Sequence, residues 1–257
     1  MRTHTNGVGR SMWTCLAAVV AVSALNGQPV AVVEYRVEGP SGVSQLRDRF
    51  SSPQLETLEK INRADRAHLG ELDEMLVPPT WSSDELDYST MPRRYPSGEG
   101  HGKLVLVHLP GQMFGAYESG RLVRWGPVSS GARQAPTPEG LFHLNWRSAG
   151  HTSTINPEWF LRWYFNFDNR GGLALHQRSL PGHPASHGCV RLLERDARWL
   201  FEWGDAWTLD ASQTLVTRAG TPMLIVGAYD FDALPPWRSP EWLARTVALP
   251  PMPDLVN

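Results

Sequence analysis

The sequence predicts a mainly β domain, sandwich-like or barrel-like, that contains one or two helices and follows a small N-terminal helical segment. Short runs of alternating or β-branched residues succeed one another from His101 onward, with Gly and Pro between them. Leucines at helical spacing precede these runs, and one amphipathic stretch interrupts them. The 257 residues are 41% hydrophobic and 19% charged, a composition that allows a sizeable core and excludes global disorder.

Residues 1–27 are interpreted as an export signal that is cleaved, with an uncleaved membrane anchor as the alternative. Arg2 and Arg10 supply positive charge, and an apolar stretch over 12–25 follows. This stretch is short for a membrane span of about 20 residues, which favours cleavage. One of the two cysteines lies within it. Cleavage would leave Cys189 without a partner for an internal disulfide.

Residues 28–101 are expected to form a helical segment followed by a linker. Over 44–76, hydrophobic residues recur at mostly three- and four-residue spacings among charged ones, with Ser52-Pro53 as the expected helix start and Gly70 between two helices. Residues 77–100 are rich in Pro, Ser and Gly, as in a linker or a wrapping arm. The helical positions are Leu46, Leu55, Leu58, Ile61, Leu69, Leu72, Met75 and Leu76.

Residues 102–227 are expected to form the β-rich domain, and 228–257 a Pro-rich strap along it. One helix is predicted in "LLERDARWLFEWGDAW", where Trp199, Trp203 and Trp207 recur every fourth residue. This stripe is interpreted as core packing rather than a sugar platform. The expected strands lie in "KLVLVHL", "QMFGAYE", "RLVRWGPVSSG", "GLFHLNW" and "LVTRAGTPMLIVG".

The charge pattern argues against one class of partner. The formal net charge is −2, and no concentrated basic face is evident in the sequence, so nucleic acid is not an expected ligand. A zinc site is also disfavoured, because the sequence has neither a C-x-x-C nor an H-E-x-x-H spacing.

The stretch "HPASHGCVRL" concentrates chemistry around Cys189. A thiol nucleophile needs a base or a cationic neighbour. If 186–190 is extended, His187 and Cys189 point to the same side. Gly188 lets a substrate approach the backbone and leaves the amides of Gly188 and Cys189 free to hold an oxyanion. His176 ends the strand-like "GGLALH", and the loop that follows can return this strand end beside Cys189, which makes His176 the candidate base.

Several aromatic and histidine side chains lie near this stretch in the sequence. "NPEWFLRWYF" falls between two expected strands of the domain and is a candidate lid over the site. His143 is expected to face the cleft or solvent, and His183 to lie on the loop surface near the site. For Trp146, Trp159, Trp163 and Tyr164, core or lid packing is favoured over a substrate groove.

"SHGCVRL", preceded by a His on a Gly-flanked strand, resembles the signature of the L,D-transpeptidases of bacterial cell walls. Upstream pieces agree with this resemblance, including the "VSSG" turn and Thr137-Pro138-Glu139-Gly140 before a strand. "AGTPMLIVG" resembles the closing strand of that domain. The resemblance covers 102–227 in the expected order.

The resemblance implies a mostly β L,D-transpeptidase catalytic domain that works by cysteine acyl transfer. It makes Cys189 the nucleophile and His176 the base that activates it. It implies supporting roles for His187 as an orienting histidine, Ser186 in local hydrogen bonding, Gly188 in the oxyanion hole with the Cys189 amide, and Arg191 in holding a substrate carboxylate or the loop.

The function that follows from the resemblance is that of an exported peptidoglycan L,D-transpeptidase in the periplasm or cell envelope, acting in cell-wall organisation and cell shape. Its expected partner is a peptidoglycan stem peptide, whose diamino acid–D-Ala bond is exchanged through a thioester for a bond to an amine. No metal or organic cofactor is implied. The alternatives are an L,D-carboxypeptidase or amide hydrolase with the same site, and an inactive envelope-binding protein.

Overall fold

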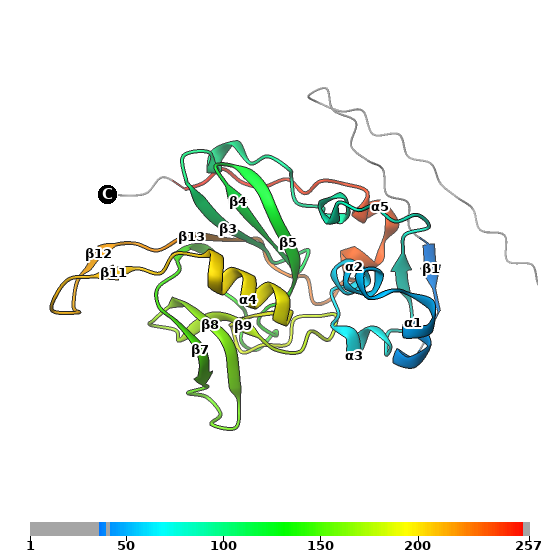
Figure 1. Cartoon of the computed structure of the whole chain (residues 1–257), viewed down its shortest axis with the longest axis horizontal. Helices are drawn as coiled ribbons and strands as arrows, with labels where there is room; N and C mark the ends of the chain where they lie inside the picture. The colour runs from blue at the N-terminus through cyan, green and yellow to red at the C-terminus, as the bar shows by residue number, and fades with distance from the viewer. Residues whose placement is uncertain (1–35, 40–41, 254–257) are drawn as a thin grey trace, which may run out of the picture. The chain divides into compact units, whose positions relative to one another are not determined.

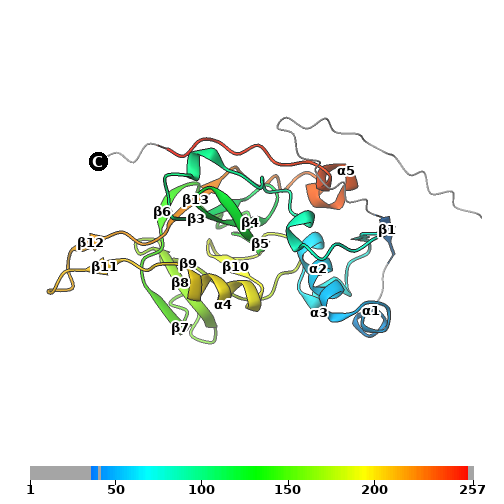
Figure 2. The same ribbon diagram turned by 45° about the horizontal axis from the view of Figure 1, so that its top comes forward.

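The computed structural model describes residues 36–39 and 42–253. Within them, nine strands form one curled sheet in the order β6-β13-β3-β4-β5-β10-β9-β8-β7 (Figures 1 and 2). The mainly β fold class predicted from the sequence is thereby confirmed. The strands are β3 (Lys103–His108), β4 (Met113–Glu118), β5 (Arg121–Ser129), β6 (Gly140–His143), β7 (Arg147–Thr152), β8 (Phe160–Asp168), β9 (Leu173–Gln177), β10 (Val190–Leu192) and β13 (Pro222–Val226).

The main hydrophobic core lies between the two halves of this sheet and α4 (Glu194–Trp203). Val105 and Phe114 enter it from β3 and β4, and Phe165 and Leu175 enter it from β8 and β9. Leu200 of α4 packs against the same cluster. Because β-strand side chains alternate between faces, burying one face of β9 and β10 in this core leaves their other face for polar residues.

A second cluster covers the opposite face of β3, β4 and β13 with segments from both ends of the described chain. Tyr88 and Tyr95 come from the stretch before β3, which contains η1 (Glu85–Tyr88) and η2 (Pro96–Gly98). Trp237 and Leu243 come from η3 (Pro236–Arg238) and α5 (Pro240–Leu243) of the C-terminal segment. Figure 2 shows this segment running along the sheet. Within residues 77–100, Tyr88, Met91 and Tyr95 therefore pack on this face of the sheet.

The N-terminal helical region differs from its prediction at one end. It contains α1 (Val43–Arg49), α2 (Ser52–Asn62) and α3 (Arg66–Leu69), with Gly70 directly after α3. Met75–Val77 is the strand β2, not a continuation of helix, and pairs with β1 (Arg36–Glu38). All three β2 residues are buried, and a short, fully apolar run fits a buried strand as well as a helix.

The amphipathic helix predicted in the second half of the chain is shorter than expected. Helix α4 ends at Trp203, so Trp207 lies outside it, just before the exposed hairpin of β11 (Thr208–Leu209) and β12 (Val216–Arg218). Trp199 and Trp203 stack with ring centroids 5.0 Å apart and pack partly buried against the main core. The interpretation of these two tryptophans as packing residues agrees with this arrangement.

Within residues 36–39 and 42–253, every helix is too short or too polar for a transmembrane span. The export signal or anchor expected over 1–27 lies outside the described residues.

Arg63 joins three separate parts of the fold. It follows α2 in the left-handed conformation, with φ of 57°, and its side chain is fully buried. The guanidinium lies over the rings of Trp125 in β5, Trp237 in η3 and Trp242 in α5, at 5.4, 5.9 and 6.0 Å from their centroids. Its Nε donates to the Gly111 carbonyl at 2.8 Å.

His108, at the end of β3, makes folding sensitive to acid. Its Nδ1 accepts a hydrogen bond from the Gly111 amide at 3.0 Å, which a protonated ring nitrogen could not do. Burial lowers the pKa of His108 to about 4, and the charge of Arg63 adds to this shift. Because the folded pKa lies below the ordinary 6.5, the stability that this neutral ring contributes is complete above pH 6.5 and is lost as pH falls through about 4.

We expect the substitution His108→Asn to reduce this acid sensitivity. The Asn side-chain oxygen can accept the same hydrogen bond without titrating. Between pH 7 and pH 4.5, the unfolding free energy of the wild type should fall by about 2 kcal/mol more than that of the variant. Urea unfolding followed by tryptophan fluorescence at both pH values measures the difference. An equal fall in the two proteins would contradict the role of His108.

Candidate active site

The pairing of β9 with β10 places His176 and Arg191 side by side. The two strands are parallel, with His176 opposite Arg191 and Leu175 opposite Val190. Leu175 and Val190 are buried in the main core. Because side chains alternate along a strand, His176 and Arg191 lie on the opposite face of the sheet. Cys189 is two residues before Arg191, at the position where the chain enters β10.

A cavity of about 40 Å³ lies over this face. Five of the six site residues predicted from the sequence line it, and the sixth, Gly188, connects two of them. Segment 153–161, which contains the connection from β7 to β8 and the first two residues of β8, also lines the cavity. The five predicted residues are His176, Ser186, His187, Cys189 and Arg191, and the other lining residues are Ser153, Ile155, Trp159, Leu161 and Arg178.

Cys189 is a free, half-buried thiol. Its Sγ lies 4.0 Å from the Gly172 carbonyl oxygen. Burial raises the pKa of the Cys189 thiol above its ordinary 9.0, while a hydrogen bond from the Ala174 amide and the charge of Arg191 act in the opposite direction. The thiol is therefore protonated at neutral pH and needs a base before it can act as a nucleophile.

His176 is buried and electrically neutral at pH 7. Only 4% of its surface is exposed, and this burial lowers the pKa of His176 to about 4. The charges of Arg191 and Arg178 lower it further, and the hydrogen bond to Gln177 acts in the opposite direction. Nδ1 lies 3.1 Å from the Gln177 carbonyl oxygen. Since a carbonyl only accepts, Nδ1 carries the ring proton and Nε2 is left with the lone pair of a base.

The hydrogen bonds of the described residues include none between the Cys189 thiol and the His176 imidazole. Catalytic hydrogen bonds are often long or misaligned before substrate binds. The two groups nevertheless line one small cavity, and they come from adjacent parallel strands.

The turn before Cys189 corrects one detail of the expected oxyanion site. The Gly188 amide is not free, because it donates to Ser186 Oγ at 3.1 Å. Ser186 Oγ in turn donates to the Cys189 carbonyl at 2.5 Å, so the Ser186 hydroxyl stabilises the turn through two hydrogen bonds. Gly188 has φ of +97°, a conformation that favours glycine, and 186–190 is thus a turn rather than an extended strand. The Cys189 amide donates to none of the described residues and remains a candidate oxyanion donor.

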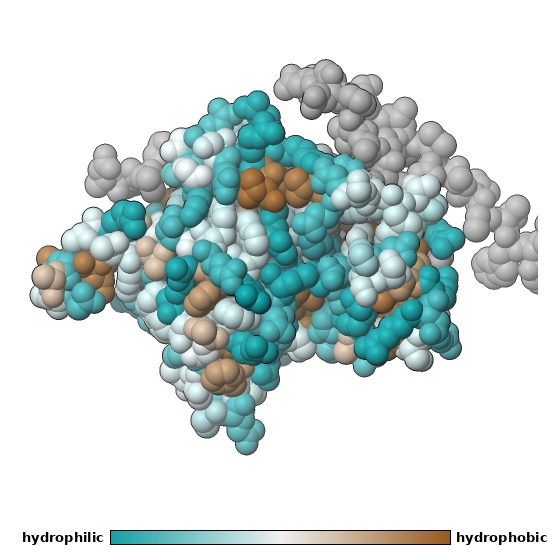
Figure 3. All heavy atoms as spheres, in the orientation of Figure 1, coloured by the Kyte–Doolittle hydropathy of each residue, from teal (hydrophilic) through white to brown (hydrophobic). Residues whose placement is uncertain are grey.

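The lid predicted over 156–165 is only partly a loop, because β8 begins at Phe160, and the segment that lines the cavity is 153–161. The Trp159 ring lies 5.2 Å from the ring of His187, and the guanidinium of Arg178 lies 5.7 Å from the same indole. Ile155 and Phe160 are 64% and 58% exposed, and hydrophobic surface is visible on the β7–β8 hairpin (Figure 3). A cavity of about 40 Å³ has room for only a few waters, so we expect this lid segment to move when a peptide binds.

The comparison with known families agrees with this geometry. The family model YkuD, the L,D-transpeptidase catalytic domain, matches residues 102–225. The L,D-transpeptidase resemblance predicted from the sequence is confirmed.

Solved structures of L,D-transpeptidases are also similar to the chain. One from Xylanimonas cellulosilytica is 26% identical, with 77% of this chain and 100% of that chain covered and a TM-score of 0.45. One from Stackebrandtia nassauensis is 26% identical, with 50% and 57% covered and a TM-score of 0.40. One from Mycobacterium smegmatis is 19% identical, with 49% and 59% covered and a TM-score of 0.39. The chain thus spans less than two thirds of the latter two structures. No curated protein matches it.

Thr137 lies in the segment that matches the L,D-transpeptidase model, and the sequence did not reveal its role. Its Oγ1 donates to the Gly188 carbonyl at 2.9 Å and accepts from the Gly131 amide at 2.8 Å. It therefore fixes the glycine turn beside Cys189. Its position in the Thr-Pro-x-Gly motif was the available signal, although the motif does not say what the hydroxyl contacts.

Asp65 holds the loop between His176 and Cys189, although it lies outside the matched segment 102–225. Its amide donates to the Leu180 carbonyl at 2.9 Å, and its Oδ2 accepts from the Leu180 amide at 2.7 Å. No local sequence pattern indicates this contact, because the two residues are 115 positions apart.

The remaining aromatic and histidine residues fall into two groups. Trp146 and Tyr164 pack in a small cluster behind the lid, which agrees with the packing interpretation, and Trp163 contacts Phe201 of α4. His143 is half-buried in β6, and His183 is exposed on the loop before Ser186, where the sequence placed it.

Proposed function

We propose that the chain is a peptidoglycan L,D-transpeptidase that transfers the acyl group of a tetrapeptide stem from D-Ala to an amine. One observation supports this most. A protonated cysteine and a neutral, buried histidine from neighbouring strands line a single cavity within a domain of the L,D-transpeptidase family. The Cys189–His176 arrangement suits acyl transfer, because a neutral base can accept the thiol proton as the thiol attacks a carbonyl.

In the first half-reaction, Cys189 Sγ attacks the carbonyl of the diamino acid that precedes D-Ala. The S–C bond forms, and the thiol proton passes to Nε2 of His176. The oxyanion of the tetrahedral intermediate accepts a hydrogen bond from the Cys189 amide, a type of interaction that typically contributes about 3–4 kcal/mol. The C–N bond then breaks, and the imidazolium of His176 returns the proton to the departing amine of D-Ala. A thioester remains on Cys189.

In the second half-reaction, an acceptor amine attacks the thioester. A new C–N bond forms, the S–C bond breaks, and the amine proton returns through His176 to the thiol. Arg191 lies beside His176 on the same face and carries no carboxylate partner among the described residues. It is placed to hold a carboxylate of the stem peptide.

The proposal locates the enzyme in the cell envelope, where peptidoglycan lies. The support is the sequence of residues 1–27, a basic start followed by an apolar stretch. N-terminal sequencing of the protein recovered from the envelope fraction of expressing cells distinguishes a cleaved signal from a membrane tether.

Mass spectrometry tests the proposed chemistry. Incubated with purified tetrapeptide muropeptides, the full chain should release D-Ala and form cross-linked dimers. A carbapenem should acylate the protein, and peptide mapping should place the adduct on Cys189. Trimmed monomers without dimers would instead indicate hydrolysis by the same site, and an adduct on another residue would overturn the assignment of the nucleophile.

A further inference from the structure

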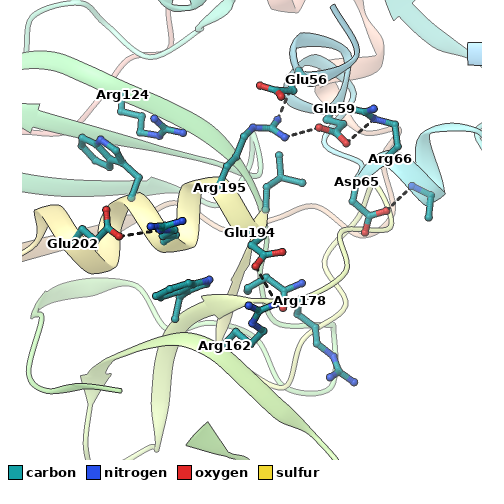
Figure 4. Close-up of a pocket in the computed structure, with 16 residues that line it drawn as sticks. Glu56, Glu59, Asp65, Arg66, Arg124, Arg162, Arg178, Glu194, Arg195 and Glu202 are labelled. Atoms are coloured by element: carbon teal, nitrogen blue, oxygen red, sulfur yellow. Dashed lines mark hydrogen bonds and ion pairs between the residues drawn. The ribbon is translucent and has the colours of Figure 1, made fainter. Parts of the chain in front are cut away.

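A second, much larger cleft lies where the N-terminal helices face α4. Its volume is about 790 Å³, within the range of sites that bind small molecules and short peptides. One side comes from α2 and α3, and the other comes from α4 and the adjoining ends of β8 and β9 (Figure 4). The surface there is mostly hydrophilic (Figure 3). The helices α2 and α3 precede residues 102–225, so one side of this cleft is built outside the segment that matches the L,D-transpeptidase model.

Ion pairs hold the two sides of the cleft together. Arg195 of α4 reaches across to Glu59 of α2 at 2.6 Å, and its other nitrogen donates to the Glu56 carbonyl at 3.0 Å. Arg66 contacts Glu59 from the same side of the cleft at 3.0 Å. The carboxylate of Glu59 is almost fully buried, so the pairs around it are protected from solvent screening. The cleft is therefore a preformed feature of the fold.

The charges that line the open part of the cleft have both signs. Arg162 and Glu194 form an exposed pair at 3.0 Å, with about half of each side chain in solvent. Among the described residues, Glu56 has no cation within ion-pair distance, and Arg178 has no carboxylate within that distance. A ligand that carries both carboxylates and an ammonium group would find partners for both charges here.

The end of β9 connects this cleft to the reaction cavity. His176 lines the reaction cavity, Gln177 lines the cleft, and Arg178 lines both. Side chains alternate along a strand, so His176 and Gln177 point to opposite faces of the sheet. Arg162 is the register partner of Gln177, so the exposed Arg162–Glu194 pair lies one strand away from this connection.

We propose that this charged cleft binds the acceptor peptide of the transfer reaction, a stem peptide with free carboxylates and a free amine. This inference rests on the proposed function. The lid segment 153–161 covers the cavity on one side, and the donor stem enters as that lid moves. The acceptor peptide binds on the side of the N-terminal helices, with its carboxylates at Arg162 and Arg178, and its amine passes Arg178 to reach the thioester on Cys189.

The test separates the two half-reactions in the full chain. Acylation of Cys189 is followed with a carbapenem. Transfer is followed by dimer formation with a tetrapeptide donor and increasing concentrations of the tripeptide L-alanyl-γ-D-glutamyl-meso-diaminopimelate, which lacks D-Ala and can act only as acceptor. In Arg162→Gln, the KM for the tripeptide should rise about tenfold, as expected for the loss of one charged hydrogen bond, while carbapenem acylation stays within about twofold of the wild type.

Two further variants test whether the effect on the KM is specific to the cleft. Glu56→Gln removes the unpaired carboxylate of the cleft, which is placed to bind the L-Ala ammonium of the tripeptide while the diaminopimelate amine reaches Cys189, and should raise the KM for the tripeptide about threefold. Arg94→Gln is the matched control, because Arg94 also forms an exposed ion pair, with Glu99, but lies outside the cleft. Exposed ion pairs such as those of Arg162 and Arg94 contribute little to stability, and Glu56 is exposed and forms no ion pair with the described residues, so all three variants should fold. The control should leave both half-reactions unchanged.

Direct binding distinguishes failure of the cleft from failure of the proposed function. The tripeptide is titrated by calorimetry onto the full chain carrying Cys189→Ala, with and without Arg162→Gln. Binding that weakens about tenfold in the double variant supports the cleft even if the wild type only hydrolyses its substrate. Equal tripeptide binding and equal KM values in the wild type and both cleft variants would overturn it. An absent carbapenem adduct on wild-type Cys189 would instead refute the proposed function.

Discussion

Replacing His176 by Gln is expected to slow the acylation of Cys189 by a carbapenem about 10²- to 10⁴-fold at pH 7. Burial raises the pKa of the thiol, so almost all of Cys189 is protonated at this pH. The pKa of His176 is about 4, so its imidazole is neutral and free to take the proton. The variant keeps a side-chain amide near the Gln177 carbonyl but offers no basic nitrogen. Acylation then depends on the small fraction of thiolate.

The pH dependence should distinguish this loss of a base from a merely distorted site. In the wild type, the acylation rate should be flat from about pH 5 to pH 8, because His176 is deprotonated throughout, and should fall as pH drops below about 4. In His176→Gln, the rate should instead climb about tenfold per pH unit through the neutral range, as thiolate forms. The exposed loop residue His183 provides the control, since His183→Gln should retain the flat profile. If His176→Gln also shows a flat pH profile of the acylation rate, His176 is not the base.

Much of the candidate site could be predicted because its residues lie on two short sequence stretches, and the single loop between them can bring His176 beside Cys189. Once β9 and β10 are parallel neighbours, alternation places His176 and Arg191 on one face, and Cys189 lies at the start of the second strand. The alternation of side chains along a strand does not predict the turn that precedes β10. Gly188 adopts a positive φ, and Ser186 takes up its amide, so the oxyanion site differs from the one expected for an extended strand.

The contacts that bring distant segments together were not predictable from local patterns. Asp65 and Leu180 form two hydrogen bonds across 115 residues, and neither residue belongs to a recognisable motif. Arg63 reads in the sequence as one more charged residue of a helical segment, yet it is fully buried. The secondary structure of Met75–Val77 was also not predictable from the local sequence. Three consecutive apolar residues show neither the helical nor the strand periodicity.

The second large effect is expected for Arg63→Ala, which should lower the free energy of unfolding by about 3–5 kcal/mol. The substitution leaves a cavity between three indole rings, those of Trp125, Trp237 and Trp242. It also leaves the Gly111 carbonyl and the Lys60 carbonyl without the donors that they have in the wild type. Arg63→Lys should recover only part of the loss, since an ammonium group cannot stack on the rings and donate in several directions as the planar guanidinium does.

Arg66→Ala, three residues away, is the matched comparison for Arg63→Ala. Arg66 also pairs with a neighbouring group, Glu59, but 29% of its side chain is exposed, and Arg195 remains on the same carboxylate. Its removal should cost about 1 kcal/mol or less. Urea unfolding followed by tryptophan fluorescence reports on both variants, because the indoles around Arg63 change environment when the N-terminal helices separate from the sheet. If both variants lose the same free energy of unfolding, Arg63 contributes no more to stability than a partly exposed arginine, despite its burial. A larger loss in Arg63→Ala would identify it as the residue that fastens α2 to the sheet and to the C-terminal segment.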